Sequence, residues 1–140
     1  MHIELRRSPN VADARVLSEG IVEFNRQAVP GLEEVASEIR FHVFVREAGT
    51  IQGGLRAACF WNTLHIELLW LSEAVRGRGL GRAVMARAED FAIDCGLHNS
   101  WVETTSWQAR PFYERCGYVC IAEVPDRPVG QCSFYLHKPL

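Results

Sequence analysis

The chain begins with helical periodicity and then changes to strand periodicity. Ser8 and Pro9 have the form of a helix start, a capping residue followed by proline at the first helical position. Apolar residues then recur every three to four positions as far as Ala28, where a Pro-Gly pair ends the pattern. Across residues 40–46 apolar and polar positions alternate instead, which predicts a half-buried strand.

Two more strands and a second helix are predicted next. A hairpin turn leads into a strand over residues 51–61, whose start Gly53 and Gly54 should weaken or bulge. A polar break separates it from a strand over residues 64–71. Short connections between these strands predict an antiparallel meander. The clearest helix covers residues 80–95, because its apolar residues repeat every three to four positions until a glycine stops it.

The C-terminal part alternates short strands with one short helix. Strands are expected at residues 100–104, 118–124 and 132–137, and the helix at residues 108–116. Pro111 is compatible with that helix only in its first turn, where a missing N–H costs little. With one strand expected before the first helix, the predicted order is β-α-β-β-β-α-β-α-β-β.

Length and composition fit a single domain, residues 1–140. The chain has 140 residues, 48% hydrophobic and 23% charged, the balance of a soluble globular protein with one core. A net charge of −2 with scattered basic residues argues against nucleic acid as a partner. No apolar run suits a signal peptide or a membrane helix, which predicts a cytoplasmic protein with no membrane partner. Five cysteines, an odd number without paired C-x-x-C spacing, argue against a disulfide framework and a metal site.

One glycine-rich segment between an apolar strand and an amphipathic helix has the chemistry of a phosphate-binding loop. Its residues are Arg76, Gly77, Arg78, Gly79, Leu80, Gly81 and Arg82. Amide groups at a helix start are unpaired and attract anions, and glycines allow the anion to approach closely. Guanidinium groups add forked donors suited to phosphate oxygens. The spacing excludes a Walker loop and a dinucleotide fingerprint, which leaves a flexible connection as the plain alternative.

The spacing of Arg76, Gly79 and Gly81 resembles the acetyl-coenzyme A signature of the GNAT family of N-acetyltransferases. That signature is Gln or Arg, two residues, Gly, one residue, then Gly or Ala. A second run, residues 108–118, resembles the short helix and following strand of the same family. The resemblance covers essentially the whole chain and implies an α/β (α+β) fold, with a mixed central sheet of about six to seven strands and helices on both faces. It implies direct transfer of an acetyl group from acetyl-coenzyme A to a primary amine within one ternary complex.

The resemblance also implies which residues hold the donor. The main chain of Leu69, Trp70 and Leu71 is expected to pair with the pantetheine arm, and the loop over residues 76–82 is expected to hold the pyrophosphate. Many relatives have asparagine where this chain has Ser106, which is expected to contact the cofactor arm with a shorter reach. The family fold separates the strand before the loop from its parallel neighbour, and the donor occupies the wedge.

Two residues are candidates for proton transfer. An alkyl ammonium with a pKa of about 10.4 must lose a proton before it attacks. Glu67 is the candidate base, acting through water, and a solvent-facing charge is the alternative reading. Tyr113 matches the family tyrosine that protonates the departing thiolate, and a core tyrosine with a polar tip is the alternative. Cys116 lies nearby, but no base is paired with it, which favours a structural thiol over an acyl-cysteine.

The sequence does not identify the amine. Glu33, Glu34 and Glu38 would favour a cationic acceptor if they form an acidic rim, and an ordinary solvated loop is the alternative. A non-catalytic acyl-coenzyme A sensor is the second functional reading, because it would need the loop but neither Glu67 nor Tyr113. Nucleic-acid binding through the loop is disfavoured, since one loop makes few phosphate contacts. Longer acyl groups and a homodimer through an exposed C-terminal strand edge are left open.

Overall fold

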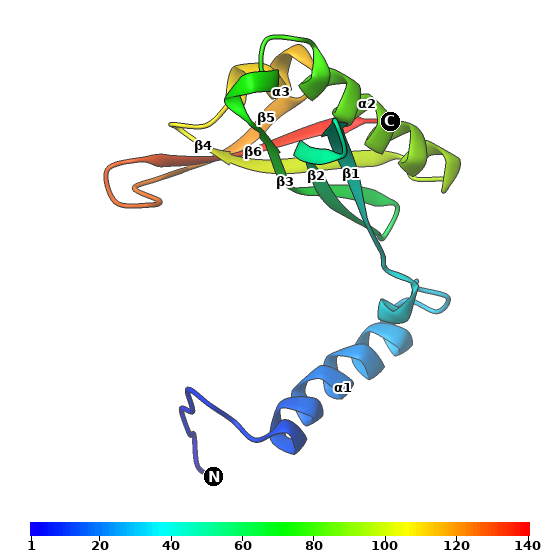
Figure 1. Cartoon of the computed structure of the whole chain (residues 1–140). Helices are drawn as coiled ribbons and strands as arrows, with labels where there is room; N and C mark the ends of the chain where they lie inside the picture. The colour runs from blue at the N-terminus through cyan, green and yellow to red at the C-terminus, as the bar shows by residue number, and fades with distance from the viewer. The chain divides into compact units, whose positions relative to one another are not determined.

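The structure, a computed structural model, describes residues 1–140 and divides into two compact units, Met1–Glu34 and Val35–Leu140. The first unit contains the helix α1, and the second contains the sheet and the remaining helices (Figure 1). None of the helices is both long and apolar enough to cross a membrane. All five cysteines are free thiols.

Helix α1 (Val11–Ala28) starts two residues later than the sequence pattern predicts. Asn10 is the capping residue, and its side chain accepts a hydrogen bond of 2.7 Å from the amide of Asp13. An Asx cap satisfies one of the free amide groups of the first turn, so the helix starts there and not at Ser8. The predicted end before Pro30 is confirmed, whereas the strand expected before this helix is absent.

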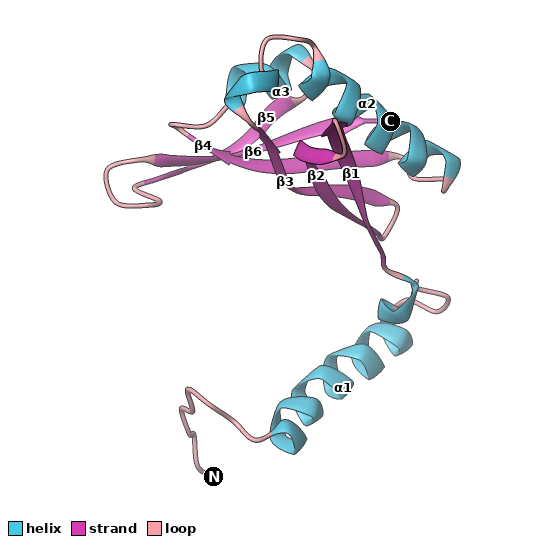
Figure 2. Cartoon of the chain, in the orientation of Figure 1, coloured by secondary structure: helices cyan, strands magenta, loops and turns pink.

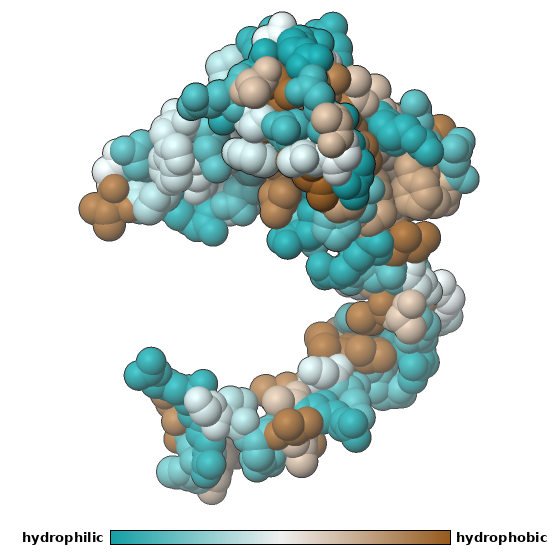
Figure 3. Space-filling view, viewed as in Figure 1, coloured by the Kyte–Doolittle hydropathy of each residue, from teal (hydrophilic) through white to brown (hydrophobic).

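Apolar side chains of α1 are exposed on its surface. Leu17 is 78% exposed, Ile21 56% and Phe24 66%, and they lie three to four residues apart on one side of the helix. The space-filling view shows such apolar side chains among polar ones on this unit (Figure 3). The predicted amphipathic periodicity is therefore present in the helix.

The second unit is built on one mixed sheet of six strands (Figure 2). The strands are β1 (Ile39–Glu47), β2 (Thr50–Phe60), β3 (Thr63–Leu71), β4 (Asn99–Thr105), β5 (Val119–Pro125) and β6 (Cys132–Pro139). Their order in the sheet is β1-β2-β3-β4-β6-β5, and every neighbouring pair is antiparallel except β3 and β4. The predicted meander and the parallel pair are both confirmed.

Tight turns and a bulge shape the meander. Ala48 and Gly49 connect β1 to β2, and Trp61 and Asn62 connect β2 to β3; all four have positive φ, as two-residue hairpin turns require. The β1–β2 register shifts between Val45 and Arg46, opposite the start of β2. The predicted bulge at the start of the second strand is thus confirmed.

Strands β3 and β4 pair over only part of their length. Their register runs from Thr63, opposite Asn99, to Ile66, opposite Val102, and then ends. Beyond Ile66, β3 stays paired with β2 on its other side as far as Leu71. The main chain of β3 therefore has a free edge toward β4 in its last residues.

Helices α2 (Leu80–Asp94) and α3 (Arg110–Arg115) lie on the same face of this sheet (Figure 1). The core between sheet and helices is formed by apolar side chains, the most buried being Leu55, Ala57, Leu64, Ile66, Met85, Ala88, Ala92, Val102 and Leu136. Pro111 lies in the first turn of α3, as expected. The expected second layer of helices, on the other face, is not part of this unit.

A buried polar cluster joins α2 to the sheet. The hydroxyl of Tyr118 lies 2.6 Å from that of Ser100 and donates to Glu89 of α2 at 3.1 Å. Lys138 donates to the same carboxylate at 2.6 Å. Burial raises the pKa of Tyr118 far above its ordinary value, so its hydroxyl stays protonated. Each polar group in the cluster has a partner, which makes burial of the cluster tolerable.

Candidate active site

A cavity of about 930 Å³ opens where β3 and β4 separate. Its walls are the last residues of β3, the glycine loop, the end of β4 and helix α3. The lining includes Glu67, Leu69, Trp70, Leu71, Arg76, Gly77, Gly79, Leu80, Gly81, Arg82, Thr104, Trp107, Gln108, Phe112, Tyr113 and Cys116. Most of the residues predicted to hold the donor therefore line one cavity.

The glycine loop delivers the start of α2 to this cavity. Gly79 is the residue before the helix and has φ of 77°, a left-handed conformation that favours glycine. The amides of the first turn that follows have no acceptor within the helix. Gly81 is buried, and a Cβ there would lie 3.1 Å from the Phe112 ring, so glycine also allows α2 and α3 to pack closely.

The three arginines of the loop differ in their surroundings. Arg76 and Arg82 line the cavity, and each donates to a main-chain oxygen, Arg76 to Leu71 at 2.9 Å and Arg82 to Arg115 at 3.2 Å. Arg78 does not line the cavity. It pairs with Glu47 at 3.1 Å.

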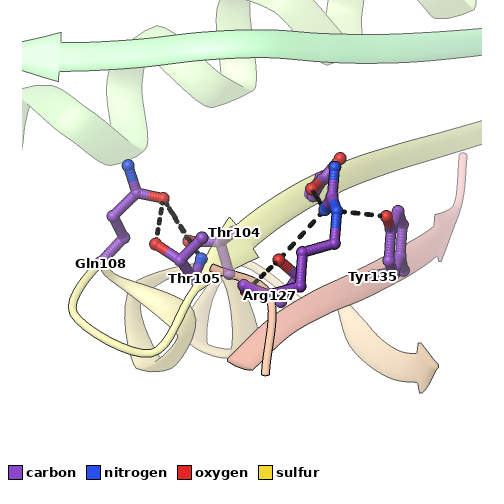
Figure 4. A network of polar contacts seen from close by, with 7 residues as sticks. Thr104, Thr105, Gln108, Arg127 and Tyr135 are labelled. Carbon is purple, nitrogen blue, oxygen red and sulfur yellow. Dashed lines mark hydrogen bonds and ion pairs between the residues drawn. The ribbon is translucent and has the colours of Figure 1, made fainter. Parts of the chain in front are cut away.

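Ser106 also lies outside the cavity lining. Its hydroxyl donates to the side chain of Gln131 at 2.5 Å and accepts from the amide of Cys132 at 3.2 Å, which ties it to the start of β6. Gln108 lines the cavity and accepts from the amide of Thr105 at 3.2 Å and from its hydroxyl at 2.8 Å (Figure 4). Gln108 thereby fixes the chain just after β4.

Tyr113 is 7% exposed and reaches the cavity from α3. Burial raises the pKa of its phenol to about 12. The phenol is therefore protonated at neutral pH and can donate a proton or a hydrogen bond into the cavity. Burial also raises the pKa of Cys116, which disfavours the thiolate that an acyl-cysteine route would need.

Glu67 lies where this cavity meets a second one. Its carboxylate accepts from Arg40 at 2.9 Å and from Arg56 at 2.5 Å, one guanidinium on each oxygen. Its side chain is only 13% exposed, so the carboxylate is enclosed by these partners. The reading of Glu67 as a merely solvent-facing charge does not fit this environment.

The second cavity, of about 470 Å³, lies on the sheet face that α2 and α3 leave uncovered. Its lining includes Glu38, Arg40, Ala58, Phe60, His65, Glu67 and Trp101. The rings of His65 and Trp101 are parallel within 6°, with centroids 4.0 Å apart. Burial lowers the pKa of His65, so its imidazole is neutral at neutral pH and can accept a proton.

Hydrogen bonds fix the loop between β5 and β6 on the sheet face that α2 and α3 leave uncovered. Arg127 donates to Glu103, to the Ser133 hydroxyl at 3.1 Å and to the Tyr135 hydroxyl at 3.2 Å (Figure 4). Ser133 in turn donates to the main-chain oxygen of Arg127 at 2.8 Å. These contacts hold the loop beside the end of β4.

The sequence pattern of the acetyltransferase (GNAT) family matches residues 13–118. The chain belongs to this family. It is therefore an acetyltransferase with the GNAT fold, and the α/β class with a mixed six-stranded sheet is confirmed.

Curated relatives of this acetyltransferase include two enzymes named for antibiotics. Blasticidin-S acetyltransferase of Streptomyces morookaense is 44% identical over 95 residues, which are 67% of this chain and 70% of that protein. Streptothricin acetyltransferase of Streptomyces lavendulae is 33% identical over 93 residues, 63% of this chain and 49% of that protein. The match to the second enzyme thus covers about half of its length.

Solved acetyltransferases have the same fold. A crystal structure from Bacillus cereus has a TM-score of 0.88 and 25% identity, covering 100% of this chain and 98% of that one. An acetyltransferase of Bacillus anthracis in complex with acetyl coenzyme A has a TM-score of 0.66 and 20% identity, covering 72% and 62% of the two chains. At that identity the second comparison supports the fold alone.

Sequence reasoning on this GNAT chain missed the second cavity. His65, Trp101 and Ala58 come from three strands, and only the register of the sheet brings them together. One local signal was available. His65 and Trp101 lie at alternate positions to the buried residues of β3 and β4, which placed both on the face away from the core.

Proposed function

We propose that this acetyltransferase binds acetyl-coenzyme A in the larger cavity and passes its acetyl group directly to a primary amine that enters from the smaller one. The observation that carries the proposal is that the two cavities meet at Glu67. A thioester held on one side and an amine on the other would then be in contact without a covalent enzyme intermediate. Proximity of this kind supplies a large part of the rate enhancement of a bimolecular transfer.

The chain offers groups that fit the donor substrate. Residues 67–70 of β3 have no strand partner on the edge facing β4, and such an edge can bind an extended arm that carries amides of its own. The main-chain oxygen of Leu71 accepts from Arg76. The start of α2, with Arg76 and Arg82 in the lining, suits a diphosphate. Arg78 and Ser106 lie outside the lining, and the structure gives neither of them a contact in this cavity.

Two groups in the smaller cavity can take the proton of the attacking amine. Glu67 is at the junction, where the amine must meet the thioester, but both of its oxygens already accept from arginines. His65 lies two residues earlier on the same face and is held neutral by burial. Either group can act through a water molecule, and Tyr113 is the proposed acid for the departing thiolate.

For the acceptor, we propose an amine-bearing antibiotic. The support comes from the similarity to blasticidin-S acetyltransferase. Glu38 and Glu67 both line the smaller cavity, but Arg40 pairs with both of them and Arg56 pairs with Glu67, so the charge of the cavity adds no preference for a cationic amine. Glu33 and Glu34, the other two residues of the predicted acidic rim, are not among the lining residues of this cavity. They belong to the first unit, and Glu34 pairs with Arg26.

Turnover assays test the proposed function. Purified protein with acetyl-coenzyme A is expected to acetylate blasticidin S or streptothricin, with kcat/KM of about 10⁴ M⁻¹s⁻¹ or more for a physiological acceptor. Release of free thiol and mass spectrometry of the product would follow the reaction. Binding of acetyl-coenzyme A without turnover of any amine would favour the sensor reading instead. No heat of binding for any coenzyme A species at millimolar concentration would contradict both.

The pH profile distinguishes the two candidate bases. Because the pKa of His65 lies below its ordinary value, the acid limb of kcat/KM is expected below about pH 6.5. Activity should fall as the pH falls through that pKa, since the protonated imidazole accepts no proton. The Glu67 charge raises the pKa of His65, so Glu67→Gln should move the limb to lower pH if His65 is the base. If Glu67 is the base, Glu67→Gln should remove the limb, and His65→Gln should keep it.

A further inference from the structure

The larger cavity is lined by a third arginine, which the proposed function does not use. Arg115 is the last residue of α3, and it lines the cavity together with Arg76 and Arg82. Arg82 donates to the main-chain oxygen of Arg115 at 3.2 Å, which places Arg115 directly beside the glycine loop. The cavity therefore has three arginines around the place proposed for phosphate.

These three arginines have no carboxylate partners. None of them forms an ion pair, and the two that belong to the loop donate to main-chain oxygens instead. Two nearby arginines outside the lining differ, because Arg78 pairs with Glu47 and Arg110 pairs with Glu114. Positive charge that no carboxylate neutralises favours an anionic ligand in this part of the cavity.

The contacts of the two loop arginines show on which side of the loop Arg115 lies. Arg76 donates to the main-chain oxygen of Leu71, at the end of β3. Arg82 donates to that of Arg115, at the end of α3. The proposed function places the pantetheine arm along β3, so this arm leaves the diphosphate on the Arg76 side. The nucleotide part of the donor then leaves the diphosphate on the other side, toward Arg115.

The thiol of Cys116 indicates where the charge of Arg115 acts. Cys116 lines the cavity, and burial is the main cause that raises its pKa, while the charges of Arg82 and Arg115 oppose that shift. Both guanidinium groups are therefore near this part of the lining. Lys138 also acts on the thiol, but its ammonium pairs with Glu89 at 2.6 Å. Arg115 is thus the cation at this end whose side chain has no hydrogen-bond partner.

Coenzyme A carries a phosphate group that matches this arginine. Its 3′-phosphate is a monoester on the same ribose to which the diphosphate is attached, so the two anionic groups are neighbours. Such a monoester has a charge of about −1.5 to −2 at pH 7 and three acceptor oxygens. A guanidinium group presents forked donors that fit phosphate oxygens. The diphosphate would use the loop, and the monoester would then meet Arg115.

We propose that Arg115 binds the 3′-phosphate of the donor, and that this contact makes the chain prefer coenzyme A to its 3′-dephospho form. The proposal rests on the proposed function, because it takes the larger cavity as the donor site. It goes further by adding a binding residue and a second anion subsite to that cavity.

Two ligands that differ only in this phosphate test the proposal. Calorimetric titration of the full chain would give dissociation constants for coenzyme A and for 3′-dephospho-coenzyme A. Coenzyme A is expected to bind at least about tenfold more tightly, because the contact is a charge-assisted hydrogen bond. Equal affinities, or tighter binding of the dephospho form, would overturn this proposal and leave the proposed function standing. No binding of either ligand would contradict both.

Substitutions test whether Arg115 holds the phosphate. Arg115→Gln should bind 3′-dephospho-coenzyme A as the wild-type chain does, and should lose most of the preference for coenzyme A. Arg115→Lys keeps the charge without the fork and should retain part of the preference. Arg87→Gln changes an exposed arginine of α2 outside the cavity lining and should retain all of it. An unaltered preference in Arg115→Gln, or equal weakening of both ligands, would overturn the assignment.

Discussion

Tyr113→Phe is expected to lower kcat by about 100-fold or more, with the affinity for acetyl-coenzyme A nearly unchanged. The change removes only the hydroxyl that reaches the larger cavity, and the departing thiolate then has no phenol to protonate it. Because burial raises the pKa of Tyr113 to about 12, the phenol should stay protonated, and this group should cause no loss of activity between pH 7 and 10. Steady-state assays with an accepted amine, and calorimetry with acetyl-coenzyme A, would measure both quantities.

Tyr118→Phe is the matched control for this prediction. Tyr118 is also buried, and its ring lies 6.1 Å from that of Tyr113, but its hydroxyl points to Ser100 and Glu89 and it does not line the cavity. Loss of that hydroxyl should cost about 1 kcal/mol of unfolding free energy and leave kcat within a few-fold of wild type. A wild-type kcat in Tyr113→Phe would show that another group protonates the thiolate.

Gly54→Ala is expected to destabilise the second unit by at least about 3 kcal/mol. A Cβ at Gly54 would lie 2.1 Å from the main-chain oxygen of Val43, and the backbone has φ of 155°. The added Cβ and the Val43 oxygen cannot move apart without breaking the hydrogen bonds between β1 and β2. Because β2 also pairs with the end of β3 that lines the larger cavity, acetyl-coenzyme A binding should weaken along with stability. Urea unfolding followed by circular dichroism would measure the change.

Gly20→Ala provides the opposite control. Gly20 is inside α1, and a Cβ added there would meet nothing within 4 Å. Alanine has a higher helix propensity than glycine, so this change should stabilise α1 by up to about 1 kcal/mol. If Gly54→Ala unfolded at the same urea concentration as wild type, the close approach of β2 to β1 would not require glycine at position 54.

Local patterns were sufficient for most of the elements. Periods of two and of about 3.6 residues predicted β1 to β6, α2 and α3 to within a few residues, because each period reflects which face of one element is buried. The start of α1 was wrong by two residues, since Asn10 and Ser8 are both good caps and only the folded backbone selects one. The expected N-terminal strand was wrong as well.

The larger cavity could be predicted in part because many of its lining residues are close in sequence. Arg76, Gly79, Gly81 and Arg82 lie in one loop whose position before a helix follows from local signals. The orientation of single side chains could not be predicted in the same way. Arg78 turns to Glu47 and Ser106 to Gln131, and both partners come from distant parts of the chain.

The sequence by itself determined the family, the order of the main elements and the loop at the start of α2, since all of these depend on short-range spacing. Only the tertiary structure decided that Arg40 and Arg56 enclose Glu67, and that the rings of His65 and Trp101 stack on the uncovered face of the sheet. Those contacts depend on strand register, which is set by the packing of the whole sheet. A shift of one residue would move each of these side chains to the opposite face.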